Sequence, residues 1–282
     1  MVIGTTECLT NRPARRTDNG QDAATGCAVR ADRTVAVRDV THVYHSDGQE
    51  IPALQGISFD VQAGKFVSLV GPSGCGKSSL LMMLAGLLAP TSGAIDVAGQ
   101  RQSEPDPTRV GVVFQDASLF PWLTAVRNVE FPLFLQGMDK GSRHERAMAA
   151  LELVGLAAFA DRFPRELSGG MKQRVSIARG LVQDPPILLM DEPLLSPHEQ
   201  TRMTMGDELL KIWDRTGKTV VFVTHSLSEA VYLSDEVVVF SGRPGRVLER
   251  IAVSLPRPRS LEVMSSPEFA GIREAIWRLI RP

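Results

Sequence analysis

The sequence predicts an α/β protein with a mainly parallel sheet at its core, and three features of the 282 residues support this. Short apolar runs do not alternate with polar residues, which is typical of strands buried on both faces of a parallel sheet. Glycine-rich or polar residues follow each run, as at the carboxyl ends of such strands. Segments with helical periodicity lie between the runs. The strands are expected at residues 66–70, 110–114, 187–190 and 220–223.

Composition and charge exclude several classes of protein. Hydrophobic residues make up 43% of the chain and charged residues 22%, so a disordered, collagenous or coiled-coil chain is not expected. The net charge of -1 gives no overall attraction to nucleic acid or to an anionic membrane. The longest nearly apolar run, residues 80–89, is about half the length that crosses a bilayer, and the N-terminus lacks an apolar signal core. A reducing cytosol is expected from three cysteines without metal-ligand spacing, Cys8, Cys27 and Cys75.

The chain divides into a tail, a large domain and a terminal helix. Residues 1–33 mix charges of both signs without a sustained period and are expected to form a flexible tail. Residues 34–260 form the domain, with a helical insert at about 116–174 because the interval between two strands is too long for a simple crossover. Residues 261–282 are expected to dock on the domain as an amphipathic helix through Phe269, Ile272, Ile276 and Leu279.

A glycine-rich motif follows the first predicted strand and precedes a helical segment. Its pattern, G-x-x-x-x-G-K-[ST], is that of a phosphate-binding loop, in which backbone N–H groups and the helix N-terminus attract phosphate. Lys77 would neutralise the β and γ phosphates, and the Ser78 hydroxyl would be a ligand of Mg²⁺. The alternative, a glycine-rich turn with an exposed lysine, does not account for the strand, the spacing and the helix together. The motif comprises Gly71, Pro72, Ser73, Gly74, Cys75, Gly76, Lys77 and Ser78.

Polar residues also follow the other three strands, and they should meet at one edge of the sheet. Asp191 suits the outer coordination shell of Mg²⁺, and Glu192 is placed to accept a proton from an attacking water and to orient it. His225 is positioned to donate a hydrogen bond to a γ-phosphate oxygen, and Gln115 to reach the metal and the water. Each also has an ordinary interpretation. Asp191 and Glu192 fit a solvated strand end, His225 fits a structural histidine, and Gln115 fits a surface amide.

A second anion site is expected at the Ser-Gly-Gly turn before the helix around residues 175–181. Ser168, Gly169 and Gly170 would present backbone N–H groups and a hydroxyl at a helix N-terminus. The spacing fits a plain helix cap equally well.

The segments GPSGCGKSS, LSGGMKQR and ILLMDEP, together with Gln115 and His225, resemble in their order the ATP-binding subunit of an ABC transporter. The resemblance covers roughly residues 34–282. The segments VVFQDASLFPWLTAVRNVEF and VVVFSGRPGRV are similar to the importers of nitrate, aliphatic sulfonates and taurine. The resemblance implies a P-loop NTPase fold: a mainly parallel sheet core, an antiparallel β subdomain and a helical insert.

The resemblance also implies the cofactors and partners, namely ATP with Mg²⁺, a second copy, membrane permease subunits and indirectly a solute-binding protein, without nucleic acid. In a head-to-tail homodimer, the phosphate loop of one copy faces residues 168–170 of the other. Tyr44 would stack on adenine and Ser79 would bind the nucleotide, although an aromatic at such a position is often simply packed. Residues 120–122 would dock the permease or else fill the core of the helical insert. The expected location is peripheral, on the cytoplasmic side of the inner membrane.

One segment departs from the family pattern. Relatives usually follow Asp-Glu-Pro with an aromatic residue, small residues and then Leu-Asp, whereas the loop at 194–199 has Leu195 and places His198 at the aspartate position. Ser196, Pro197 and Glu199 still form a capping box for the next helix. The alternative function that follows is a regulatory module that dimerises on ATP but hydrolyses it weakly. A DNA-repair or chromosome ATPase is disfavoured by the neutral charge and by the absence of coiled-coil or zinc insertions.

Overall fold

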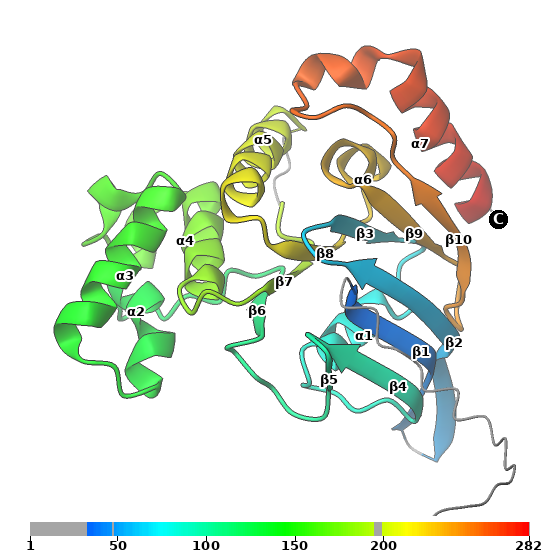
Figure 1. Cartoon of the computed structure of the whole chain (residues 1–282), viewed down its shortest axis with the longest axis horizontal. Coiled ribbons are helices and arrows are strands. Elements are labelled where there is room, and N and C mark those ends of the chain that lie inside the picture. The colour runs from blue at the N-terminus through cyan, green and yellow to red at the C-terminus, as the bar shows by residue number, and fades with distance from the viewer. Residues whose placement is uncertain (1–32, 47, 195–198, 282) are drawn as a thin grey trace, which may run out of the picture.

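The computed structural model describes residues 33–46, 48–194 and 199–281. The expected tail at 1–33, apart from Arg33, and residues 195–198 of the altered loop lie outside the described residues, so the tail and the capping box remain predictions. Two sheets and seven α-helices form the described part of the chain, together with three short 3₁₀ segments (Figure 1). None of these helices is long and apolar enough to cross a bilayer.

The larger sheet has six strands in the order β10-β9-β3-β8-β7-β6. Five of the strands are parallel, and only β10 pairs antiparallel, with β9. All four strands expected from the sequence lie here side by side, with bounds that differ from the expected ones by at most one residue, so the predicted parallel sheet is confirmed. The strands are β3 (Phe66–Val70), β6 (Val110–Val113), β7 (Ile187–Asp191), β8 (Thr219–Val223), β9 (Glu236–Phe240) and β10 (Val247–Ala252).

The smaller sheet is antiparallel, in the order β2-β1-β4-β5. It matches the antiparallel subdomain that the resemblance implied. Its register shifts several times, so β1 is bent along its length. The strands are β1 (Arg33–Ser46), β2 (Gln49–Gln62), β4 (Ser92–Val97) and β5 (Gln100–Arg101).

The helices fall into two groups in Figure 1. α2 (Ala125–Leu135), α3 (Lys140–Leu153) and α4 (Gly169–Leu181) gather at one side of the parallel sheet and are called the helical region below. α3 ends at Leu153, and the left-handed φ of 71° at Gly155 follows its last turn. The other helices are α1 (Lys77–Leu84), α5 (Glu199–Thr216), α6 (Leu227–Leu233) and α7 (Pro267–Ile280).

The parallel sheet separates two hydrophobic cores. Alternate residues of β3 point to opposite faces: Phe66 and Val70 join the core shared with the helical region, α6 and α7, whereas Val67 and Leu69 join the core shared with α1 and the antiparallel sheet. Every other strand of this sheet except β10 divides its residues between the cores in the same way. The helical region and the antiparallel sheet are therefore packed on opposite faces.

The C-terminal helix α7 begins at Pro267, with the Ser266 hydroxyl accepting a hydrogen bond from the Phe269 N–H. Phe269 and Ile276 are fully buried in the core that the parallel sheet shares with the helical region, whereas Trp277 is half exposed. The helix packs beside α6 and strands β9 and β10. Its apolar face is thus part of the core.

Candidate functional site

The phosphate loop connects β3 to α1, and its backbone leaves no room for side chains at two glycines. Gly76 has a left-handed φ of 96°, and a Cβ there would lie 2.6 Å from Leu54 Cδ2. A Cβ at Gly71 would lie 2.9 Å from the Phe240 carbonyl oxygen. The loop is therefore clamped between β2 and β9, and only glycine fits at these positions.

Lys77 is buried at the start of α1, and its ammonium group turns back over the loop. Nζ donates to the carbonyl oxygens of Gly71 and Pro72 at 2.9 Å and contacts Cys75 Sγ at 3.6 Å. Cys75 is itself fully buried. The loop thus holds one cation at its centre, close to the backbone that would surround a phosphate.

A cavity of about 220 Å³ opens in front of the loop. On one side the Tyr44 hydroxyl donates to Ser79 Oγ at 2.9 Å, and the Tyr44 ring meets the His42 ring edge-on at 4.5 Å between centroids. This side of the cavity is aromatic, and the other is built from loop backbone and polar groups. The lining residues are Tyr44, Ala53, Ser73, Gly74, Gly76, Lys77, Ser78, Ser79, Glu192 and Arg243.

Ser78 and Asp191 meet where α1 faces the end of β7. Ser78 Oγ donates to Asp191 Oδ1 at 3.2 Å. Burial raises the pKa of the Asp191 carboxyl, and the neighbouring Glu192 adds to this, while the Ser78 hydrogen bond and Lys77 oppose it. A hydroxyl and a carboxylate oxygen are ligands that Mg²⁺ prefers, so the residues present fit this metal. No group of three or more His, Cys, Asp or Glu suited to a metal ion occurs in the described ranges.

Glu192 and His225 follow the neighbouring strands β7 and β8, and their side chains meet. His225 Nδ1 lies 3.0 Å from Glu192 Oε2. Glu192 has a left-handed φ of 44°, and its N–H donates to the Val223 carbonyl oxygen at 2.9 Å. A left-handed backbone is unfavourable for a residue with a side chain by about 1–2 kcal/mol, and such positions cluster at functional sites. The backbone conformation thus fixes where the carboxylate stands.

The structure does not bring every predicted residue into the cavity. Gln115 lies two residues beyond β6, is exposed, and does not line the cavity. Ser168 caps α4 by accepting from the Met171 N–H at 3.3 Å, and a Cβ at Gly169 would meet nothing within 4 Å. Gly170 follows in the first turn of α4. None of these three residues lines the cavity within one chain.

Sequence reasoning missed two lining residues, Ala53 and Arg243. Ala53 belongs to β2, which the residue pattern did not reveal. Arg243 lies in a segment recognised only for its turn signals, and it reaches the phosphate loop 169 residues back along the chain. No spacing in the sequence points to that contact.

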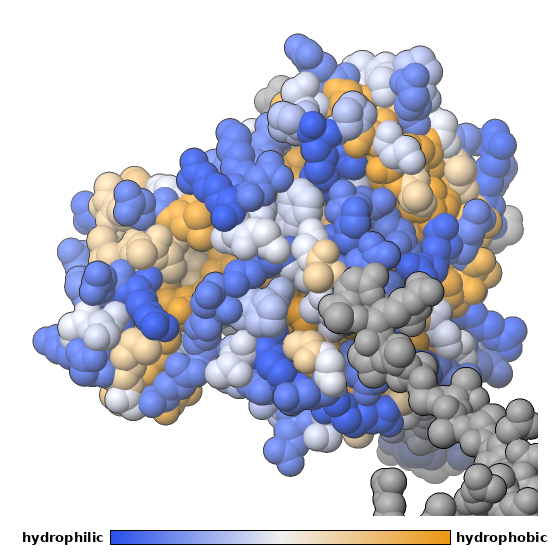
Figure 2. Space-filling model, in the orientation of Figure 1, coloured by the Kyte–Doolittle hydropathy of each residue, from blue (hydrophilic) through white to orange (hydrophobic). Residues whose placement is uncertain are grey.

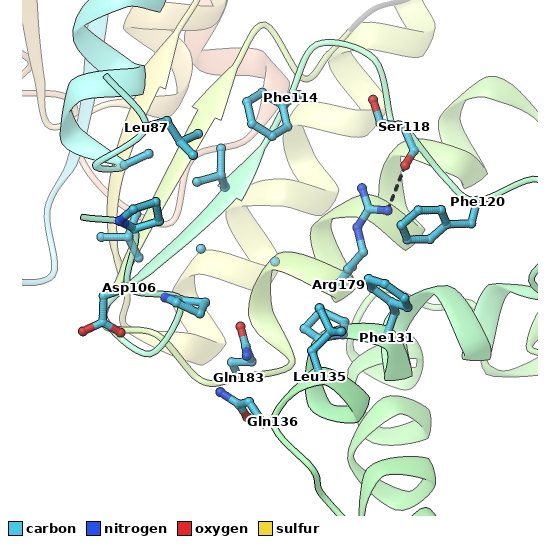
Figure 3. A pocket seen from close by; sticks show the side chains of 18 residues that line it. Leu87, Asp106, Phe114, Ser118, Phe120, Phe131, Leu135, Gln136, Arg179 and Gln183 are labelled. Atoms are coloured by element: carbon cyan, nitrogen blue, oxygen red, sulfur yellow. Dashed lines mark hydrogen bonds between the residues drawn. The ribbon is translucent and has the colours of Figure 1, made fainter. Parts of the chain in front are cut away.

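A larger groove of about 770 Å³ lies between the helical region and the edge of the parallel sheet, on the side of β6. Figure 3 shows Phe120, Phe131 and Leu135 facing Leu87 and Phe114 across it. Arg179 donates to the carbonyl oxygens of Ser118 and Ala117 at 2.9 and 2.8 Å, and burial lowers its pKa. The groove is mostly apolar with few polar groups. Of the predicted docking residues 120–122, Phe120 lines it and Trp122 is strongly exposed.

Comparisons with known proteins agree on one family. Residues 54–195 match the family described as ABC transporter. The chain is 43% identical over 251 residues to the nitrate import ATP-binding protein NrtD of Synechocystis, covering 87% of this chain and 94% of the relative. It is 43% identical over 247 residues to the taurine import ATP-binding protein TauB of Burkholderia pseudomallei, covering 86% of this chain and 95% of that relative.

Solved structures give the same picture. A dimeric ATP-binding cassette in a post-hydrolysis state, bound to ADP and Pi, has a TM-score of 0.69 and 33% identity, covering 79% of this chain and all of the cassette. CbiO1 of Clostridium perfringens, part of the ABC transporter complex cbiONQ, has a TM-score of 0.72 and 27% identity, covering 89% of this chain and 97% of CbiO1. The predicted fold class is therefore confirmed.

Proposed function

The chain belongs to the ABC transporter family, and we propose that it is the subunit that couples ATP hydrolysis to import of a small solute of the nitrate, sulfonate or taurine type. As a member of this family it is an ATPase that uses ATP and Mg²⁺. The observation that carries the proposal is the convergence of Lys77, Ser78 and Glu192 on one cavity, with Tyr44 at its other side.

In this proposal different residues of the cavity bind different parts of the nucleotide. Tyr44 stacks on adenine, and the loop from Gly71 to Ser79 surrounds the phosphates with N–H groups and hydroxyls. The ammonium of Lys77 already lies over the loop, and it exchanges its two carbonyl partners for phosphate oxygens. For Lys77 the phosphate contacts replace bonds that the side chain makes within the loop, so this residue needs little rearrangement.

Ser78 and Asp191 are the residues that would hold Mg²⁺, which when bound neutralises charge on the phosphates. Gln115, at the end of β6, is a further candidate only if it moves toward them. Glu192 accepts one proton from water as the water oxygen attacks the γ-phosphorus, and the bond to the bridging oxygen breaks to leave ADP and phosphate. His225 keeps the Glu192 carboxylate in place by donating from Nδ1 across the 3.0 Å contact, and it donates to a γ-phosphate oxygen from Nε2, with a proton on each ring nitrogen.

A second copy of the chain would complete the site. Residues 168–170 do not line the cavity of their own chain, and a Cβ at Gly169 would meet only open space, so this helix start is free to face another molecule. A relative of 33% identity forms a dimeric structure. We therefore place residues 168–170 of one copy against the phosphate loop of the other, with ATP between them.

The groove beside the helical region would receive a short segment of a membrane permease subunit. Figure 2 shows apolar side chains gathered over this region, at the left of the molecule. Exposed aromatic and aliphatic residues are concentrated here, among them Trp122, Phe134 and Leu135. Closure of two copies on ATP would then move the permease segments. The chain would work peripherally on the cytoplasmic side of the inner membrane, and a solute-binding protein would act through the permease.

The altered loop at 194–199 favours a second function, a regulatory module that pairs on ATP but hydrolyses it weakly. His198 stands where the family carries aspartate, and it lies outside the described residues. Rapid turnover would exclude this alternative, and tight ATP-dependent pairing with slow turnover would favour it.

The test is the MgATP turnover of the purified chain across a range of protein concentrations, with Lys77→Ala as the blank. The rate per subunit is expected to rise with concentration and to vanish in the blank. A rate no higher than the blank at every concentration, with or without the permease, would contradict the hydrolytic function.

A further inference from the structure

The loop between β9 and β10, residues 241–246, is pinned between β2 and the phosphate loop. The Gly245 N–H donates to the Ala53 carbonyl oxygen and the Gly245 carbonyl accepts from the Gln55 N–H, both at 2.9 Å. A Cβ at Gly245 would lie 2.0 Å from the Cys75 carbonyl oxygen. The backbone of this loop therefore touches both β2 and the phosphate loop directly.

Hydrogen bonds inside the loop fix its shape. The Ser241 N–H donates to the Arg246 carbonyl oxygen at 2.9 Å, and Ser241 Oγ accepts from the Arg246 N–H at 2.9 Å and donates to the Pro244 carbonyl oxygen at 3.1 Å. Arg243 thus projects from a closed and anchored turn, and its position relative to the phosphate loop is set by the fold.

The Arg243 side chain lies against the rim of the nucleotide cavity. Its Nε donates to the Gly74 carbonyl oxygen at 3.2 Å, and the side chain lines the same cavity as Lys77 and Ser78. Lys77 is buried and its ammonium is already bonded to loop carbonyls. Arg243 is exposed, so its guanidinium is the accessible positive group on this cavity within the residues that the structure describes.

We propose that Arg243 is a further nucleotide-binding residue, whose terminal Nη groups bind an oxygen of the phosphate chain of ATP while Nε stays on Gly74. A guanidinium presents its donors in a planar fork, so one side chain can bridge a carbonyl and a phosphate at once. This assignment rests on the proposed ATP-binding function and adds a contact from a loop outside the motifs that carry it.

The test compares Arg243→Gln with Arg246→Gln in the full-length chain. Glutamine in place of Arg243 keeps a donor for the Gly74 carbonyl but removes the charge and the fork. Arg246 belongs to the same loop, but its guanidinium turns away to Gln55 Oε1 at 2.6 Å and does not line the cavity. Dissociation constants are measured calorimetrically for MgATP and for adenosine, and melting temperatures are measured alongside.

We expect Arg243→Gln to raise the dissociation constant for MgATP about tenfold, as for one partly exposed hydrogen bond to a charged group. Binding of adenosine, which has no phosphate, should change less than about twofold, and Arg246→Gln should bind both as the parent does. Unchanged MgATP binding in Arg243→Gln, an equal loss for adenosine, or an equal loss in Arg246→Gln would each overturn the assignment. A parent chain that binds no MgATP would overturn the proposed function itself.

Discussion

The substitution Glu192→Gln tests the assignment of the catalytic base. Glutamine has the shape of glutamate, so the φ of 44° and the hydrogen bond from the backbone N–H to Val223 stay as they are. Its amide oxygen can still accept from His225 Nδ1, which lies 3.0 Å from the carboxylate in the parent. What is lost is the ability to take a proton from water.

The expected size of the effect follows from that single loss. Removing a positioned base lowers the rate about 10²–10⁴-fold, or about 3–5.5 kcal/mol in the activation free energy. Binding should persist, because Glu192 raises the pKa of the neighbouring Asp191 and its neutralisation removes a repulsion there. We therefore expect the dissociation constant for MgATP to stay within about threefold of the parent or to fall.

The assay is initial-rate phosphate release at saturating MgATP, with calorimetric binding on the same preparations. Glu249→Gln is the matched control, since Glu249 is exposed on β10 and does not line the cavity. The control should turn over like the parent. A Glu192→Gln protein that hydrolyses ATP within about threefold of the parent would refute the assignment of the base, and loss of MgATP binding would show that the carboxylate acts in binding instead.

Three further predictions concern packing, the loop and pH. Phe269→Ala should lower the free energy of unfolding by about 3–5 kcal/mol, because the ring is fully buried, whereas Trp277→Ala should change it by less than about 1 kcal/mol; urea unfolding distinguishes them. Gly76→Ala should abolish MgATP binding in calorimetry, since its Cβ would lie 2.6 Å from Leu54 Cδ2 in a left-handed backbone. Asp106→Asn should cost about 1 kcal/mol of unfolding free energy at pH 7, and less as the pH falls from about 4 toward 2.

The pH prediction depends on the sign of one shift. Hydrogen bonds from Thr108 and then Arg109 lower the pKa of Asp106 to about 2, so the ionised carboxylate favours the folded state above the pKa of the unfolded chain. That contribution disappears as the pH falls through about 2. Its size is reduced from the full shift because the Asp106 side chain is 34% exposed. A pH-independent difference between variant and parent would contradict this account, and equal stabilities of Phe269→Ala and Trp277→Ala would contradict the packing of α7.

The sequence predicted the parallel sheet well because its strands are apolar on both sides and end in polar residues. β3 has the bounds that the pattern indicated, and neighbouring strands brought Glu192 and His225 together as the sheet-edge argument required. The antiparallel sheet was expected only as a subdomain implied by the resemblance, without bounds for its strands. Apolar and polar residues do not alternate regularly along β1, because the strand is bent at several register shifts. Its sequence therefore shows no strand period.

The site was predictable where it is local in sequence and not where it depends on tertiary packing. The phosphate loop is one motif, so its residues were found together. Arg243 reaches Gly74 from a distant hairpin, and nothing in a linear pattern encodes that approach. Gln115 was expected at the sheet edge and lies there, yet the cavity does not extend across the sheet as far as β6.

The division of the protein into two cores by the parallel sheet has an evolutionary consequence. One wall of the groove beside β6 is carried by α2 and α4, whose buried residues lie in the core of the helical region, while the opposite wall includes Ala85 and Val110 of the other core. The Tyr44 side of the cavity rests on the antiparallel sheet, which packs in that other core. Substitutions in one core reach the other only through the shared strands, and effects at well-separated sites are close to additive. The surface beside the helical region can therefore change in evolution to suit a new membrane partner, while substitutions at the Tyr44 end of the cavity are selected independently.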